Sequence, residues 1–165
     1  MLGGQPMRIY CKGDTGLNMA VRGDKVLLVP ADSNDESQHW FQESDAVGKL
    51  TDDEERPAFA LVNRTTGQAI VADRSKQLGL APYSGHVAVE VPMLWSLGRP
   101  LAAGDDDDGG GFREIRMLRD VRYTLNGING HVKPGTVVGI YTSEPASVHA
   151  VWKIAPVDLL EPRIS

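Results

Sequence analysis

Three tryptophans, Trp40, Trp95 and Trp152, lie 55 and 57 residues apart in the chain. Each closes a segment in which the same features follow in the same order. A short apolar strand leads through a turn to a second strand, then through a Gly/Asp/Asn turn to a third strand and a Trp-containing fourth strand. A sequence pattern that recurs at a regular spacing indicates repeated supersecondary units. Each unit can bury its apolar side chains only by packing against the others. The repeats are predicted at about 7–44, 57–98 and 112–156.

The strands inside the repeats are predicted from local chemistry. Residues 8–12 and 113–118 alternate polar and apolar side chains, as half-buried strands do. Residues 26–29, 59–62 and 137–141 are rich in β-branched or aromatic side chains, and 18 glycines and 10 prolines mark frequent turns. No long segment shows a helical apolar period. The sequence therefore predicts an all-β protein, either a sandwich or a barrel.

A threefold repeat of four strands selects the β-trefoil, with three pseudo-symmetric repeats and the three tryptophans in one core. A sandwich with three unrelated core tryptophans is the alternative. The length of 165 residues fits a single domain over 1–165. Between repeats two and three, residues 98–111 (GRPLAAGDDDDGGG) have too little apolar surface to offset their ordering entropy, which predicts a flexible acidic loop. Its four adjacent aspartates lack the alternating spacing of a calcium loop, so no metal site is predicted.

Charge and cysteine content exclude several classes of protein. The net charge of -5 argues against a nucleic-acid binder, which needs clustered Lys and Arg. Cys11 is the only cysteine, so neither an intrachain disulfide nor a cysteine-based zinc site is expected. Neither a secretion signal nor an apolar run of the roughly 20 residues of a membrane span is found. The expected localisation is cytoplasmic and nuclear.

Several longer motifs carry a resemblance to a known family. Gln38-His39-Trp40 has the Gln-x-Trp form that marks ricin-type trefoils. The phrases that extend the resemblance are RIYCK (8–12), LVPADSNDESQHW (28–40), PAFALVN (57–63), TGQAI (66–70), LW (94–95), FREIRM (112–117), GTVV (135–138) and VWKIAP (151–156). Together they resemble the Euonymus lectin domain of plants from residue 8 to residue 156.

The resemblance implies a function as well as a fold. Lectins of this family, which include stress-responsive cereal proteins, are nucleocytoplasmic ricin B-like trefoils. The implied partners are mannose-rich, galactosyl or blood-group glycans, and a homodimer is an expected way to present more than one site. No cofactor is implied.

A trefoil sugar site combines a short acid or amide at the turn between the second and third strands, an aromatic ring at the end of the third strand, and an amide before the closing tryptophan. The third repeat keeps the ring as Tyr141 and places Asn126 at the position of the family's aspartate. His149, near the family's glutamine, and Glu144 complete this set. Against the family pattern, Ser143 replaces a second Trp and Val148 replaces an Asn.

The other two repeats have incomplete sets. Repeat one has Asp24 and Gln38 but Val29 at the ring position, so the site is incomplete, and the alternative is that both polar residues hold turns. Repeat two has Asp73, with Ala81 at the ring position, Met93 in place of the amide, and Tyr83 as a partial substitute. The resemblance also points to Asp52 and Gln68, for which the alternative is an acidic surface loop and a turn glutamine.

No enzyme is predicted, since no nucleophile elbow, phosphate loop or zincin motif occurs. The histidines lack ligand spacing, and His39 is expected to be exposed opposite the core face of Trp40. The carboxylates at 52–55 stand in a run too polar to bury one of them as a catalytic acid. The main alternative to a lectin is a protein-interaction module on the same scaffold, since trefoils serve both roles.

Overall fold

The computed structural model describes residues 4–84, 90–100, 111–144 and 147–157. Most of the predicted acidic loop (residues 101–110) therefore lies outside the described residues, with its four aspartates. The strands in the described part are β1 (Met7–Cys11), β2 (Leu17–Arg22), β3 (Lys25–Pro30), β4 (Trp40–Glu43), β5 (Ala60–Asn63), β6 (Gln68–Ala72), β7 (Leu78–Pro82), β8 (Trp95–Leu97), β9 (Ile115–Met117), β10 (Asp120–Gly127), β11 (Val138–Thr142) and β12 (Trp152–Pro156). Short 3-10 turns occur at η1 (Glu36–Gln38), η2 (Asp45–Val47), η3 (Val91–Met93) and η5 (Ile128–Gly130).

Six strands close into a barrel. Antiparallel pairing joins β12 to β1, β1 to β4, β4 to β5, and β8 to β9. Two isolated bridges complete the ring: Phe59 with Trp95 links the start of β5 to β8, and Arg113 with Trp152 links the start of β9 to β12. Each repeat contributes its first and fourth strands to this barrel. Closure leaves no free edge strand in the barrel wall, which protects it from pairing with other chains.

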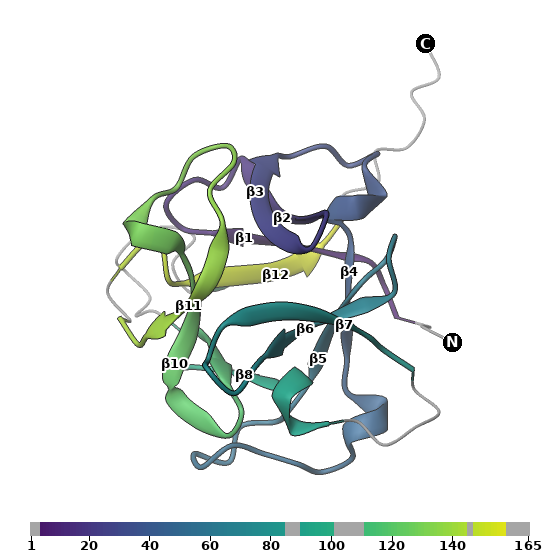
Figure 1. The fold of residues 1–165 in the computed structure, drawn as a ribbon, viewed down its shortest axis with the longest axis vertical. Helices are drawn as coiled ribbons and strands as arrows, with labels where there is room; N and C mark the ends of the chain where they lie inside the picture. Colours follow the sequence, from purple (N-terminus) through teal and green to yellow (C-terminus); the bar gives the residue numbers. More distant parts are fainter. Residues whose placement is uncertain (1–3, 85–89, 101–110, 145–146, 158–165) are drawn as a thin grey trace.

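The second and third strands of each repeat form a hairpin, namely β2–β3, β6–β7 and β10–β11. Figure 1 shows the three hairpins around the centre of the view, with β2–β3 above, β6–β7 below it and β10–β11 on the left. The bridge between Leu27 and Val137 joins the first and third hairpins directly. The first hairpin turns within two residues because Gly23 takes a φ of 65°, a conformation that glycine adopts without steric cost.

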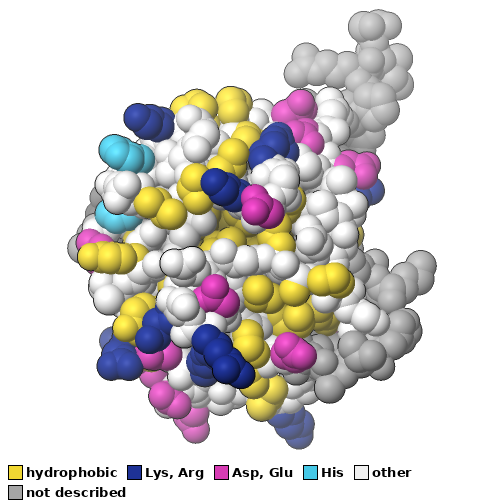
Figure 2. Space-filling view, viewed as in Figure 1, with side chains coloured by type: hydrophobic (Ala, Val, Ile, Leu, Met, Phe, Trp, Pro, Cys, Tyr) yellow, Lys and Arg dark blue, Asp and Glu magenta, His cyan; other side chains and the backbone are white. Residues whose placement is uncertain are grey.

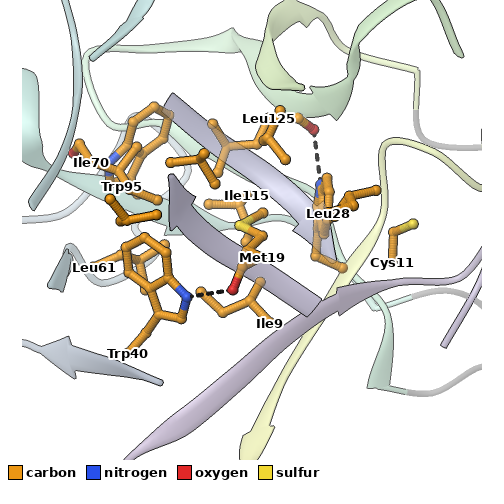
Figure 3. Packing of buried hydrophobic residues seen from close by; sticks show 14 of the residues in the cluster. Ile9, Cys11, Met19, Leu28, Trp40, Leu61, Ile70, Trp95, Ile115 and Leu125 are labelled. Atoms are coloured by element: carbon orange, nitrogen blue, oxygen red, sulfur yellow. Dashed lines mark hydrogen bonds between the residues drawn. The ribbon is translucent and has the colours of Figure 1, made fainter. Parts of the chain in front are cut away.

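The core lies inside the barrel and under the hairpins. The exposed fractions of Trp40, Trp95 and Trp152 are 0%, 0% and 1%. Around them pack equivalent side chains of the first strands and of the second strands, namely Ile9, Leu61, Ile115, Met19, Ile70 and Leu125. Figure 3 shows these apolar side chains from different repeats meeting at one centre. The predicted β-trefoil, with its three tryptophans in a single core, is confirmed.

The chemistry of individual side chains agrees with this arrangement. Cys11 is buried in β1 as part of the core, and burial raises the pKa of its thiol, so it behaves as a small apolar side chain. None of the helices in the described residues has both the length and the apolar character needed to cross a membrane.

Candidate functional site

A cavity of about 480 Å³ opens beside the third hairpin. The cavity is lined by Asn126, Ile128, Asn129, Gly130, Ile140, Tyr141, Glu144 and His149. The four residues predicted for the third repeat are therefore brought together around one opening, although they come from β10, from β11 and from the segment that leads to β12. In Figure 2, histidine side chains lie at the left edge of the face viewed, over this hairpin.

Asn126 lies near the end of β10, directly opposite Gly139 of β11. Only 4% of its surface is exposed, yet it lines the cavity. Its side-chain amide has no hydrogen-bond partner among the described residues. The amide is not among the side-chain groups of the described residues that are both fully buried and unpaired, so it is open to the cavity, where a ligand hydroxyl can bond to it. Asn126 is thus a donor and acceptor available at the bottom of the cavity.

The segment between β10 and β11 forms a wall of the cavity. Two consecutive residues, Asn129 and Gly130, have φ values of 62° and 74°, which turn the chain sharply after β10. The N–H of Ile128 donates to the carbonyl of Val137 at 2.9 Å and closes the base of this segment. The turn needs the Asn-Gly pair because asparagine and glycine tolerate the left-handed region better than other residues.

Backbone and side-chain hydrogen bonds fix the opposite wall. The N–H of Gly127 donates to the carbonyl of His149 at 2.9 Å, which ties the segment before β12 to the end of β10. The carboxylate of Glu114, which is buried, accepts from the Ser143 hydroxyl at 2.6 Å and from the Glu144 N–H at 3.1 Å. Ser143, which replaces a tryptophan of the family pattern, therefore helps to hold Glu144 at the cavity.

Tyr141 supplies the ring. It lies near the end of β11, opposite Thr124, and 59% of its surface is exposed. A large aromatic side chain held in a strand at this exposure gives a flat apolar surface to a ligand that passes over the cavity. The ring, the buried amide and the two titratable side chains surround one volume, as in a small-molecule site with a few placed polar groups.

The polar residues of repeat one lie elsewhere. Gln38 is buried, and its amide is fully used within the protein: its oxygen accepts from Asn18 and from the Asp32 N–H, and its nitrogen donates to the Pro30 carbonyl and to Asp35. Gln38 therefore holds the chain between β3 and β4. Asp24 is exposed in the β2–β3 turn and lines a different cavity.

Two expectations about burial are wrong. His39 is only 2% exposed, because its Nε2 lies 3.0 Å from the Ser33 carbonyl oxygen and its Nδ1 lies 3.3 Å from an Arg64 nitrogen. Asp52 is 6% exposed, although the polar run around it suggested a surface loop. Its carboxylate accepts from the Ser96 hydroxyl at 2.6 Å and from Arg116 at 3.1 Å.

The partners of Asp52 decide its ionisation. Burial alone would raise the pKa of this carboxyl, but the Ser96 hydrogen bond, two backbone N–H groups and the Arg116 charge together hold the pKa below its ordinary value. Gln68 has separate surroundings: it begins β6 opposite Pro82, and its N–H donates to the Thr66 hydroxyl. The contacts of Asp52 and Gln68 do not join them into one site. No group of three metal-ligating side chains occurs in the described part of the chain.

No protein-family model matches the sequence. The ricin B-like lectin R40G3 of Oryza sativa subsp. japonica is 33% identical over 157 residues, which are 91% of this chain and 72% of that protein. The chain belongs to the ricin B-like lectin family.

Two further relatives of this lectin are longer. R40C1 of the same rice is 35% identical over 93% of this chain, and EULS3 of Arabidopsis thaliana is 30% identical over 94%. The chain spans less than half the length of both, at 44% and 49%. The resemblance to the Euonymus lectins of plants is confirmed by these relatives.

Solved structures agree on the fold of the lectin. The Macrolepiota procera ricin B-like lectin, determined in complex with lactose, has a TM-score of 0.66 at 16% identity and covers 94% of this chain and 98% of its own. The designed threefold-symmetric protein ThreeFoil has a TM-score of 0.64 at 16% identity and covers 91% of this chain and 97% of its own. At such identities the likeness concerns the trefoil alone.

Sequence reasoning missed part of the lectin's cavity wall. Ile128, Asn129, Gly130 and Ile140 line the cavity beside the four predicted residues. The turn at Asn129-Gly130 could have been predicted from the sequence, because an Asn-Gly dipeptide favours positive φ values. Ile128 and Ile140 carried no such signal, because apolar residues within or near predicted strands are interpreted first as core residues.

Proposed function

We propose that this lectin domain binds carbohydrate in the cavity of its third repeat. The observation that carries the proposal is the meeting of an exposed ring, Tyr141, with the cavity-lining amide of Asn126, for which no hydrogen-bond partner occurs among the described residues. Asn126, Tyr141 and His149 are not neighbours in the sequence. The pairing of β10 with β11 and the hydrogen bond from Gly127 to His149 are the contacts that bring them close together.

Each group has a chemical role towards a sugar. The Tyr141 ring offers its face to the apolar C–H side of a pyranose. The amide of Asn126 offers both a donor and an acceptor, which suits two adjacent hydroxyls, and Glu144 accepts from hydroxyls. His149 donates or accepts according to its tautomer. An Asn in place of the family's aspartate loses a charge-assisted hydrogen bond, so this site is expected to bind more weakly than its relatives'.

The ligand class is a terminal mannosyl, galactosyl or blood-group unit of a glycan, as the family resemblance implies. The relatives are named as lectins, and we infer that this domain likewise binds without catalysis and needs no cofactor. One ring and a few hydrogen bonds in an open cavity correspond to a monosaccharide Kd of about 1 mM.

The test is a glycan array followed by titration calorimetry of the strongest hit, with excess free sugar as competitor. Tyr141→Ala is expected to abolish binding, and Tyr141→Phe, which keeps the ring, to retain it. Tyr83→Ala removes a ring of the second repeat and serves as the matched control, with binding unchanged. Binding that resists free sugar, or that survives Tyr141→Ala, contradicts the proposed site.

A wild-type domain that binds no glycan, but retains a protein from a plant extract, supports the interaction module instead. The setting we propose is the cytoplasm and nucleus of a plant cell, in a stress response or in defence signalling, with a homodimer as one way to pair sites. The single buried Cys11 is compatible with a reducing compartment. A fluorescent fusion observed before and after osmotic stress tests the localisation, and light scattering tests the dimer.

A further inference from the structure

A second cavity, of about 360 Å³, lies where the three hairpins meet. All three repeats line it: the first with Asp24, Lys25 and Val26, the second with Lys76, Gln77 and Leu78, and the third with Ile128, Val137, Val138, Gly139 and Ile140. We call it the axial cavity, because the pseudo-threefold axis of the trefoil passes between these hairpins. Figure 2 shows apolar side chains near the middle of this face, with charged side chains of both signs around them.

The axial cavity adjoins the cavity of the third repeat. Ile128 and Ile140 line both. Ile128 is 41% exposed and packs over Gly139, where an added Cβ would come within 2.8 Å of its side chain. The two cavities therefore meet at these two isoleucines, and the exposed side chain of Ile128 forms an apolar ridge at their boundary. A ligand that fills one cavity and extends past this ridge enters the other.

The lining of the axial cavity suits a polar ligand with an apolar face. Val26 and Val138 are buried at its floor. Asp24, Lys25 and Gln77 are exposed at its rim, and their side chains form no ion pair or hydrogen bond with the described residues. An acceptor, a cationic donor and an amide are thus available together, which matches the mixed hydroxyls of a sugar better than a single charge.

Lys76 at the same rim is already engaged. Its Nζ lies 4.7 Å from the centre of the Tyr123 ring, in a cation–π contact. This contact leaves the charge of Lys76 in place, but Asp120 interacts with it electrostatically, so the charges around the rim are Lys25 and Lys76 against Asp24 and Asp120. This near-neutral balance disfavours a strongly anionic ligand such as a phosphate group and favours a neutral saccharide.

We propose that the two cavities form one extended site that takes an oligosaccharide of at least two residues. The first sugar lies on Tyr141, the glycosidic bond crosses Ile128, and the second sugar lies in the axial cavity against Asp24, Lys25 and Gln77. The proposal rests on the proposed function, since it assigns the ligand length of the same site. It also gives the β2–β3 and β6–β7 hairpins a role in binding, although their own repeats lack the ring.

The experiment compares short and long probes by titration calorimetry on the full chain. The probes are methyl α-D-mannoside against branched mannotriose, and methyl β-D-galactoside against lactose. For the sugar type that binds, we expect the longer probe to bind at least tenfold more tightly than the monosaccharide. The double variant Lys25→Ala/Gln77→Ala is expected to lose this gain while its monosaccharide Kd stays within about twofold of the wild type.

The matched control is Lys49→Ala/Gln42→Ala, which removes an exposed lysine and an exposed strand glutamine away from both cavities, and it should keep the gain. Methyl NMR gives an independent reading: the longer probe alone should shift Val26 and Leu78, and both probes should shift Ile140. Equal affinity of short and long probes, or a gain that survives Lys25→Ala/Gln77→Ala, overturns the extended site and leaves the proposed function intact. If the wild type binds none of the four probes and no glycan of the array, the proposed function fails and the extended site with it.

Discussion

The three tryptophans repeat one hydrogen bond as well as one position. The indole N–H of each donates to a backbone carbonyl of the second strand of its own repeat: Trp40 to Met19 at 3.0 Å, Trp95 to Ile70 at 2.9 Å and Trp152 to Leu125 at 2.9 Å. Figure 3 draws the bond between Trp40 and Met19. Each tryptophan thereby ties the barrel to a hairpin while its ring fills the core, which satisfies the polar end that a buried indole carries.

Replacing Trp152 tests this double role. Trp152→Ala is expected to lower the free energy of unfolding by about 3–5 kcal/mol, because it leaves a large cavity and an unpaired Leu125 carbonyl. Trp152→Phe keeps most of the volume and loses the hydrogen bond, at a cost of about 1–3 kcal/mol. Urea denaturation followed by circular dichroism measures both. Equal stability of the two variants would show that the hydrogen bond, and not the volume, dominates.

Asp52 is the second residue whose role is structural. Its carboxylate, together with Glu54, holds Arg116, whose guanidinium reaches both at 3.1 and 3.0 Å. A buried ion pair of this kind contributes little net stability compared with an apolar pair, but removal of one partner leaves the other charge buried. The network therefore matters mainly as a constraint on how the β4–β5 connection lies against β9.

Asp52→Ala is expected to cost about 3–5 kcal/mol, towards the lower value because Glu54 still pairs with Arg116. The pH dependence follows from the lowered pKa of Asp52 in the folded state. A lowered folded-state pKa stabilises the protein above the unfolded value of about 3.9, and this stabilisation is lost as the pH falls through the folded-state pKa. As the pH falls below about 4, stability should fall more steeply in the wild type than in Asp52→Asn. Asp53→Asn, at an exposed neighbour, should follow the wild-type curve.

At the scale of single elements, β9 shows why its pattern was hard to interpret. The stretch around it reads as a half-buried strand, yet Glu114 and Arg116 are each only 7% exposed. Arg116 reaches the Asp52 network, and Glu114 binds the chain at Ser143 and Glu144. The polar side chains of Glu114, just before β9, and of Arg116, within it, thus face two packed loops rather than solvent, and one of those loops carries part of the candidate sugar site.

The β10–β11 hairpin differs from the other two in its longer connection, residues 128–137, between the two strands. This segment passes so close to the end of β10 that a Cβ at Gly127 would lie 2.3 Å from the His131 carbonyl oxygen. The backbone at Gly127 has a φ of -70°, so the requirement for glycine there is steric and not conformational.

Gly127→Ala is therefore expected to displace the cavity wall. We expect sugar affinity to fall at least tenfold, with a loss of about 1–3 kcal/mol in the free energy of unfolding. Gly79→Ala, whose Cβ would make an ordinary 3.5 Å contact with Val71, is the matched control and should change neither quantity. Calorimetry with the best array glycan and thermal unfolding provide the two readings. If Gly127→Ala keeps the full sugar affinity, the segment between β10 and β11 is not part of the binding site.

At the scale of the whole molecule, the proposal of one complete sugar site per chain predicts how strongly the protein binds a glycan-coated surface. Repeats one and two lack an aromatic ring at the position equivalent to Tyr141. The three repeats are therefore alike in their core residues but differ in the residues available to bind a ligand. A monosaccharide Kd of about 1 mM gives fast release from a single contact. Binding of a glycan-coated surface then depends on how many copies are held together.

We expect a tandem of two copies joined by a flexible linker to bind a glycan-coated surface at least a hundredfold more tightly than the single chain. Surface plasmon resonance at low and high glycan density measures this difference. A tandem that carries Tyr141→Ala in one copy is the control and should bind like the single chain. A single wild-type chain that already binds as tightly as the tandem would show that it assembles by itself.

The sequence by itself determined the architecture and the family. The spacing of Trp40, Trp95 and Trp152, the short strands and the frequent turns dictate a trefoil because each repeat can bury its apolar side chains only against the other two. Tyr141 and Asn126 could also be chosen as candidate site residues from the sequence, because each stands at a defined position relative to the predicted strands and turns of its repeat.

Only the tertiary structure decided which polar residues are free to bind. Gln38 and Asp52 match ligand-binding types in the sequence, but partners distant in the chain, such as Asn18 and Arg116, use their hydrogen-bonding capacity. The sequence does not indicate the axial cavity as a whole, because its residues come from three hairpins, one of each repeat, that meet only when the trefoil is assembled. Strand patterns reflect contacts with near neighbours, whereas burial of a polar group and the shape of a cavity depend on segments that folding brings together.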